Sequence, residues 1–256
     1  MNRVEFDIPV WGTEIYIDAS SEVLSEAEIH RAISGVNAFF HDVDEELSTF
    51  KSESSVSKIR TNKIKIEDAP DMVQEVWRGC LIARELTLGA FDPWAAEGGF
   101  DPSGYVKGWA AEKGAEMLLA AGCNSVQINA AGDIALRGGP WKIGVVNPDN
   151  KSEILQIFEI TDGNIATSGH YEKGAHIKDP HTGLIAIGAK SGTAIGPDGG
   201  LCDAFATALM VDGADAAQWI GNPELSEYTF WAINRYENSD GALTAWSHGP
   251  NLGLAR

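Results

Sequence analysis

Four short segments of the 256-residue chain combine glycine, acids, a histidine and hydroxyl groups more densely than turns require. They are residues 89–93, 100–108, 176–183 and 203–208. Carboxylates and hydroxyls are hard oxygen ligands of the type that Mg²⁺ selects, whereas lysine and histidine can neutralise charge or move a proton. These segments therefore hold the candidate chemistry of the chain.

The segment 203–208 offers a possible metal site. Asp203 and Thr207 are four residues apart, so on a helix they share one face and lie one turn apart. A carboxylate and a hydroxyl with nearby carbonyls suit Mg²⁺. In the alternative interpretation, Asp203 is an acid favoured by the helix dipole and Thr207 bonds back to a carbonyl. By itself, the segment favours this alternative.

The segments 100–108 and 176–183 could bind phosphate and move a proton. Lys107 follows Asp101 and a Ser-Gly turn at the start of a predicted helix, where a lysine and free N–H groups suit a phosphate. A histidine side chain has an ordinary pKa near neutrality, so His176 could take part in proton transfer. A solvated Lys107 and a structural His176 are the alternatives, and Asp179 most simply shapes an Asp-Pro turn.

Composition narrows the classes of partner. The chain has 19 Lys and Arg against 37 Asp and Glu, a net charge of −18, which repels nucleic acids and anionic membranes. Its three cysteines are too scattered for a disulfide framework or a zinc site. We find no signal peptide or membrane-spanning run, and therefore expect a cytoplasmic protein. The Walker and Rossmann phosphate-binding motifs are absent from the sequence.

The elements that must position these residues are helices early in the chain and strands later. Residues 4–18 predict a strand, and Ser25 and Glu28 form a capping-box pair ahead of a long helix. A second helix is predicted after Pro70, and a third over about 107–121. The rest predicts strands at 125–129, 134–136, 141–146, 154–160, 164–168 and 184–196, helices at 203–211 and 214–220, and a hairpin at 228–246. This order indicates an α+β fold with mixed or antiparallel sheets and flanking helices.

Taken in order, these segments resemble the ApbE family, the FAD:protein FMN transferases. The resemblance begins at Trp11-Gly12-Thr13 and continues through Leu47-Ser48-Thr49-Phe50, Gly132-Asp133-Ile134 and Ala166-Thr167-Ser168-Gly169 to Ala208. Each motif is weak alone, but about eight of them in order over some 200 residues are specific. The resemblance implies a T-fold-like architecture, a short cytoplasmic type of member and a single domain over residues 1–256.

The resemblance also implies a reaction and its residues. The enzyme would split FAD with the help of Mg²⁺, release AMP and leave FMN esterified to a Thr or Ser hydroxyl of an acceptor flavoprotein with an FMN-binding domain. His176 matches the family's catalytic histidine. The implied metal ligands are Gly104, Asp203, Ala206 and Thr207. The implied flavin and phosphate contacts are Trp11, Phe50, Ala90, Phe91, Asp92, Asp101, Lys107 and Ile177.

The chain departs from the family pattern at several positions. Trp11 replaces a Met, Ala131 replaces the first Gly of Gly-Gly-Asp, His170 stands where an acid or Asn is common, His181 replaces an Arg, and the segment between Phe91 and Asp101 is short. Two other functions stay open. A short lid that admits water would give an FAD diphosphatase, and a misplaced pyrophosphate would give a non-catalytic flavin-binding protein.

Overall fold

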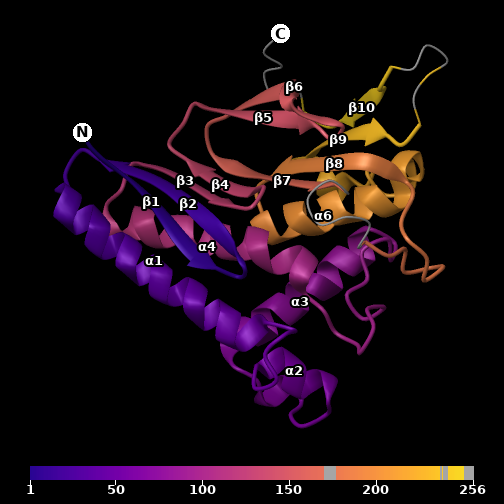
Figure 1. The fold of residues 1–256 in the computed structure, drawn as a ribbon, viewed down its shortest axis with the longest axis horizontal. Coiled ribbons are helices and arrows are strands. Elements are labelled where there is room, and N and C mark those ends of the chain that lie inside the picture. Colours follow the sequence, from indigo (N-terminus) through magenta and orange to yellow (C-terminus); the bar gives the residue numbers. More distant parts are fainter. Residues whose placement is uncertain (170–176, 237, 239–241, 251–256) are drawn as a thin grey trace.

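The computed structural model describes residues 1–169, 177–236, 238 and 242–250. One large sheet lies between helices on one side and a two-stranded hairpin on the other (Figure 1). The helices are α1 (Glu26–Leu47), α2 (Ser55–Arg60), α3 (Asp71–Leu86), α4 (Ser103–Ala121) and α6 (Gly199–Asp212), with short 3₁₀ turns η1 (Ile66–Asp68), η2 (Gly213–Gln218) and η3 (Pro223–Leu225). The predicted α+β class is confirmed.

The sheet has eight strands, and every neighbouring pair is antiparallel. Its order is β1 (Asn2–Val10), β2 (Thr13–Ser21), β3 (Ser125–Ala130), β4 (Asp133–Arg137), β7 (Gly163–Gly169), β8 (Ala189–Gly196), β9 (Thr229–Asn234) and β10 (Ala245–His248). Strands β5 (Trp141–Asn147) and β6 (Asn150–Ile160) form the separate hairpin. The helices and the hairpin thus cover opposite faces of the sheet.

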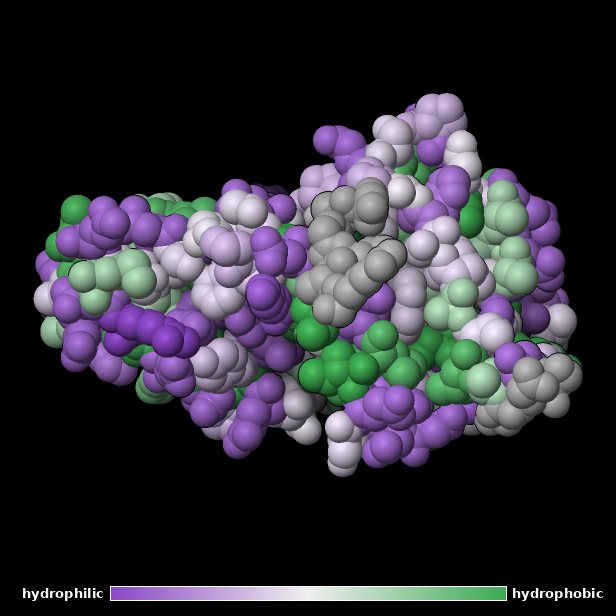
Figure 2. Space-filling model, turned by 90° about the horizontal axis from the view of Figure 1, so that it is seen from above, coloured by the Kyte–Doolittle hydropathy of each residue, from purple (hydrophilic) through white to green (hydrophobic). Residues whose placement is uncertain are grey.

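Two hydrophobic cores fill the two sides of the sheet. The larger core packs the sheet against the helices and includes the buried face of α1, namely Ile33, Val36, Phe40, Val43 and Leu47. The smaller core joins β4, β7, β8 and β9 to the hairpin. Seen from above, strongly hydrophobic residues gather at the lower middle of the view, and others are scattered toward the left and right ends (Figure 2). Among the described residues, no helix is long and apolar enough to cross a bilayer.

Several predicted boundaries were wrong. Residues 4–18 form two strands, because Trp11 and Gly12 adopt positive φ values of 57° and 70° and make a tight turn. The strand predicted at 184–196 begins only at residue 189, and the helix at 214–220 is the 3₁₀ turn η2. Helix α2 was not predicted, and at its start the Ser54 side chain accepts a hydrogen bond from the Ser57 N–H. Residues 239–241 of the hairpin predicted at 228–246 lie outside the described residues.

Two boundary errors concern the helices that carry candidate site residues. Helix α4 begins at Ser103 rather than near Lys107, and α6 begins at Gly199 rather than at Asp203. Lys107 and Asp203 therefore both lie in the second turn of their helices. In α6 the true N-cap is Asp198, whose carboxylate accepts a hydrogen bond from the Leu201 N–H at 2.7 Å.

The capping box of α1 gives a first prediction. The Ser25 hydroxyl accepts from the Glu28 N–H, and the Glu28 carboxylate accepts from the Ser25 N–H. We expect Ser25→Ala to lower the free energy of unfolding in urea by about 1 kcal/mol, since an unsatisfied N–H is left at the start of the helix. The control is Ser34→Ala in the same helix, where alanine is the better helix former and no loss is expected. Equal losses in both variants would contradict the capping role.

Candidate active site

A cavity of about 620 Å³ opens where the start of α4, the end of β7, α6 and the connecting segments around them meet. It collects residues from all four segments that the sequence singled out. Its lining includes Phe50, Ala90, Phe91, Asp92, Asp101, Gly104, Lys107, Ile177, Asp203 and Thr207, which are ten of the thirteen residues of the predicted site. Residues more than 150 positions apart in the chain are therefore brought to one cavity by the fold.

The polar end of the cavity is built around Lys107. Its ammonium forms an ion pair with Asp133, the first residue of β4, and lies 3.6 Å from Asp203 Oδ2. The Gly108 N–H also donates to Asp203 Oδ2 at 3.4 Å. Burial raises the pKa of Asp203, whereas the charge of Lys107 acts in the opposite direction. Both carboxylates are buried, so this end of the cavity carries concentrated negative charge beside one ammonium.

Hydroxyl groups lie next to this charged end. Thr207 follows Asp203 by one turn of α6, and its Oγ1 lies 3.4 Å from the hydroxyl of Ser168 at the end of β7. A Cβ placed on Gly104 would lie 3.1 Å from Thr207 Oγ1 and 3.2 Å from Phe91 Cε2. A side chain at position 104 would therefore crowd the space beside Thr207.

The remaining lining residues form the apolar wall and the mouth. Ala90 and Phe91 are buried, while Phe50 is 97% exposed. Asp92 accepts a hydrogen bond from Arg84 Nε at 2.8 Å, and Asp101 accepts one from the Ser103 N–H at 3.0 Å. These two carboxylates are thus held by their own neighbours rather than by Lys107.

Three predicted site residues do not line the cavity or cannot be placed. The Trp11 indole N–H donates to the Phe40 carbonyl at 3.2 Å, and the two rings pack edge to face. Ala206 is fully buried in α6, and its carbonyl oxygen lies 2.9 Å from where a Cβ on Gly192 would stand. His176 lies outside the described residues, as does His170. The roles given to these residues stay predictions.

The sequence interpretation missed two polar groups of the site, Asp133 and Ser168, as functional residues. Asp133 and Ser168 belong to two of the motifs on which the family resemblance rests. Their place in these motifs was the signal that could have identified them as site residues. Asp133 follows a tight turn in which Ala131 has a φ of 55° and Gly132 one of 97°. Ala131 has a left-handed backbone conformation, which is unusual for a residue with a side chain. Glycine adopts this conformation most readily.

The donor set matches a hard cation. Among the described residues, no three His, Cys, Asp or Glu side chains group closely enough to hold a metal by themselves. The Asp203 carboxylate, the Thr207 hydroxyl and backbone carbonyls are instead the oxygen donors that Mg²⁺ accepts, usually together with water and substrate phosphates. Soft metals that require thiolate or imidazole ligands do not suit this cluster.

Solved structures identify the fold. The flavin transferase ApbE from Vibrio cholerae superposes with a TM-score of 0.81 at 20% identity, covering 96% of this chain and 97% of that one. The ApbE protein from Thermotoga maritima gives a TM-score of 0.78 at 22% identity, covering 95% and 96%. The chain thus has the fold of the ApbE flavin transferases. The model of the ApbE family matches residues 94–229, and the chain belongs to this family.

Two curated relatives support the same conclusion. The chain is 28% identical over 204 residues to an FAD:protein FMN transferase from Rhodobacter capsulatus, covering 75% of this chain and 36% of that protein. It is 32% identical over 130 residues to an FAD:protein FMN transferase from Vibrio cholerae, covering 45% of this chain and 39% of that protein. The chain therefore matches well under two thirds of the length of either relative.

Cys202, beside Asp203, gives a prediction for the site. It is a buried thiol in helix α6, and Cys80 and Cys123 are buried as well. Burial raises the pKa of all three thiols, so little thiolate forms at neutral pH. We expect no thiol of the native protein to react rapidly with DTNB at pH 8, and all three to react in urea. A thiol that reacts within the mixing time in the native protein would contradict this assignment.

Proposed function

We propose that this protein transfers the FMN part of FAD to a Thr or Ser hydroxyl of an acceptor flavoprotein, with the help of Mg²⁺ and with release of AMP. The observation that carries the proposal is the placement of Lys107, Asp203 and Thr207 together on the cavity of an ApbE-family fold. The curated relatives bear the name of this activity, which supports the same reaction here.

The polar end of the cavity suits the pyrophosphate of FAD. The Lys107 ammonium would face the phosphate oxygens, while the apolar wall at Ala90 and Phe91 offers a surface for the flavin ring. Asp203 and Thr207, with carbonyls of Gly104 and Ala206, are the residues proposed to hold Mg²⁺. When bound, this ion supplies positive charge that neutralises the phosphates during transfer.

The proposed transfer is a single displacement at phosphorus. The acceptor hydroxyl oxygen attacks the phosphorus of the FMN half, and the bond between that phosphorus and the bridging oxygen breaks. The bridging oxygen leaves with AMP, and the hydroxyl proton passes to His176, the proposed base. Lys107 stabilises the charge that develops on the phosphate oxygens.

A direct assay tests the proposal. The protein is incubated with FAD, Mg²⁺ and an FMN-binding domain that contains the acceptor hydroxyl, and intact masses and AMP are measured. We expect the acceptor to gain the mass of an FMN ester with an equal amount of AMP. Free FMN with an unmodified acceptor would identify a diphosphatase instead, and absence of AMP with every divalent metal would contradict both activities.

Asp203→Asn should lower the rate of transfer by about 100-fold or more, because the amide loses the negative charge that a cation requires. The matched control is Asp215→Asn, an exposed acid just beyond α6, which should behave like the wild type. Rates are measured over a range of Mg²⁺ concentrations. An Asp203→Asn variant with the wild-type Mg²⁺ dependence would refute the metal-binding role of Asp203.

His176→Ala should leave FAD binding intact and lower the rate of transfer by about 10²- to 10⁴-fold, the usual contribution of a general base. Binding is measured by the quenching of flavin fluorescence, and transfer by intact mass. His181→Ala is the control, since His181 also lies near the cavity, against Gly89, but is not proposed to move a proton. Transfer at the wild-type rate by His176→Ala would remove His176 from the mechanism.

A further inference from the structure

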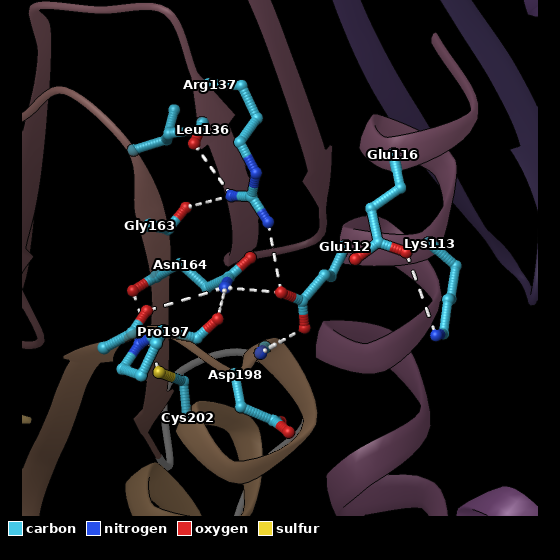
Figure 3. A network of polar contacts seen from close by, with 12 residues as sticks. Glu112, Lys113, Glu116, Leu136, Arg137, Gly163, Asn164, Pro197, Asp198 and Cys202 are labelled. Atoms are coloured by element: carbon cyan, nitrogen blue, oxygen red, sulfur yellow. Dashed lines mark hydrogen bonds and ion pairs between the residues drawn. The ribbon is translucent and has the colours of Figure 1, made fainter. Parts of the chain in front are cut away.

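A polar network behind the cavity joins the two helices that carry the candidate site (Figure 3). Glu112 of α4 accepts hydrogen bonds at both carboxylate oxygens. Its Oε1 lies 3.1 Å from Arg137 Nη2 and 3.2 Å from Asn164 Nδ2, while its Oε2 accepts from the Gly199 N–H at 2.8 Å. Gly199 is the first residue of α6, so this carboxylate connects α4 directly to the start of α6.

The network is largely shielded from water, so its charged groups are buried at a cost in desolvation free energy. The side chains of Glu112 and Arg137 are only 15% and 14% exposed. Burial raises the pKa of Glu112, and the Gly199 N–H and Arg137 oppose that rise. Arg137 also donates to the carbonyls of Leu136 and Gly163, which fixes its guanidinium at the end of β4. A buried ion pair adds little stability compared with apolar packing, so its value here lies in the geometry that it imposes.

That geometry leads to the site. Three residues spaced one turn apart on α4 meet three residues spaced one turn apart on α6 in the opposite order: Gly104 with Thr207, Gly108 with Asp203, and Glu112 with Gly199. A Cβ on Gly108 would lie 2.0 Å from the Gly199 carbonyl oxygen, so the helices touch through their backbones. The contact of Glu112 with Gly199 is thus one end of the same row of contacts that forms the site.

We propose that Glu112 is a positioning residue for the site: its carboxylate holds the start of α6 against α4, and so sets where Asp203 and Thr207 stand relative to Lys107. This inference rests on the function proposed above. Glu112 does not line the cavity, so it acts through α6 and without contact with the substrate.

Glu112→Gln tests this role with almost no change in shape. The three groups that hydrogen-bond to Glu112 are donors, namely Arg137, Asn164 and the Gly199 N–H, whereas an amide offers one acceptor oxygen and one NH₂ group. In the variant, we expect the charged Arg137 to keep its hydrogen bond to the oxygen of the new amide. The NH₂ group of that amide then faces the Gly199 N–H, to which it cannot offer an acceptor. The variant should therefore release the start of α6 while the packing of α4 is kept.

We expect the Mg²⁺ concentration for half-maximal transfer to rise by about 10-fold in Glu112→Gln, as for other residues that orient metal ligands, with the rate recovering at high Mg²⁺. Without metal or FAD, amide hydrogen exchange in residues 199–202 should become faster, while exchange in β3 stays unchanged. The control is Glu116→Gln, one turn later on α4, where the glutamate contacts Lys113 at 3.8 Å. It should change neither quantity.

The outcomes are distinct. Suppose that the wild type is active and that Glu112→Gln has the same Mg²⁺ requirement and the same amide exchange as the wild type. This result would overturn the positioning role alone. A loss of rate that high Mg²⁺ does not restore would also overturn it, because it would show general damage to the fold. Wild-type protein that neither transfers FMN nor releases AMP would contradict the proposed function itself, and the positioning role with it.

Discussion

The close approach of α4 to α6 is the constraint on which the cavity depends. Their backbones touch at Gly108 and Gly199, where any larger residue would collide with a carbonyl oxygen of the other helix. Glycine inside a helix costs about 0.5–1 kcal/mol relative to alanine, so neither helix gains stability from it. The glycines instead allow α4 and α6 to pack closely, so that Lys107 Nζ on α4 comes within 3.6 Å of Asp203 Oδ2 on α6.

The electrostatics of the cavity follow from that proximity. A chain with a net charge of −18 is an unfavourable partner for an anionic dinucleotide, and Lys107 is already in contact with two buried carboxylates. The pyrophosphate of the proposed substrate would therefore meet a site with too little positive charge of its own. This charge balance is the physical reason for which we propose a divalent cation in the reaction as well as Lys107.

Local signals in the sequence predicted helix α1 well, and the other helices and the site only in part. The Ser25 capping box depends on residues only three positions apart, so it could be predicted from the sequence. The start of α6 was misplaced because its cap, Asp198, stands before two glycines that resemble a loop. The role of Glu112 could not be predicted, since its partners lie 25 to 87 positions away and only the folded chain brings them together.

Strand β4 contributes side chains to both covered faces of the antiparallel sheet. Along β4, Ile134 and Leu136 point into the core beneath the β5–β6 hairpin, whereas Ala135 belongs to the core beneath the helices, and Asp133 reaches Lys107 on that side. Because side chains alternate along a strand, a slip of one residue would send Asp133 toward the hairpin and an isoleucine toward the cavity. The β5–β6 hairpin lies outside the cavity lining. By packing on Ile134 and Leu136, it helps to fix the register of β4 and so to keep the Asp133 carboxylate beside the Lys107 ammonium.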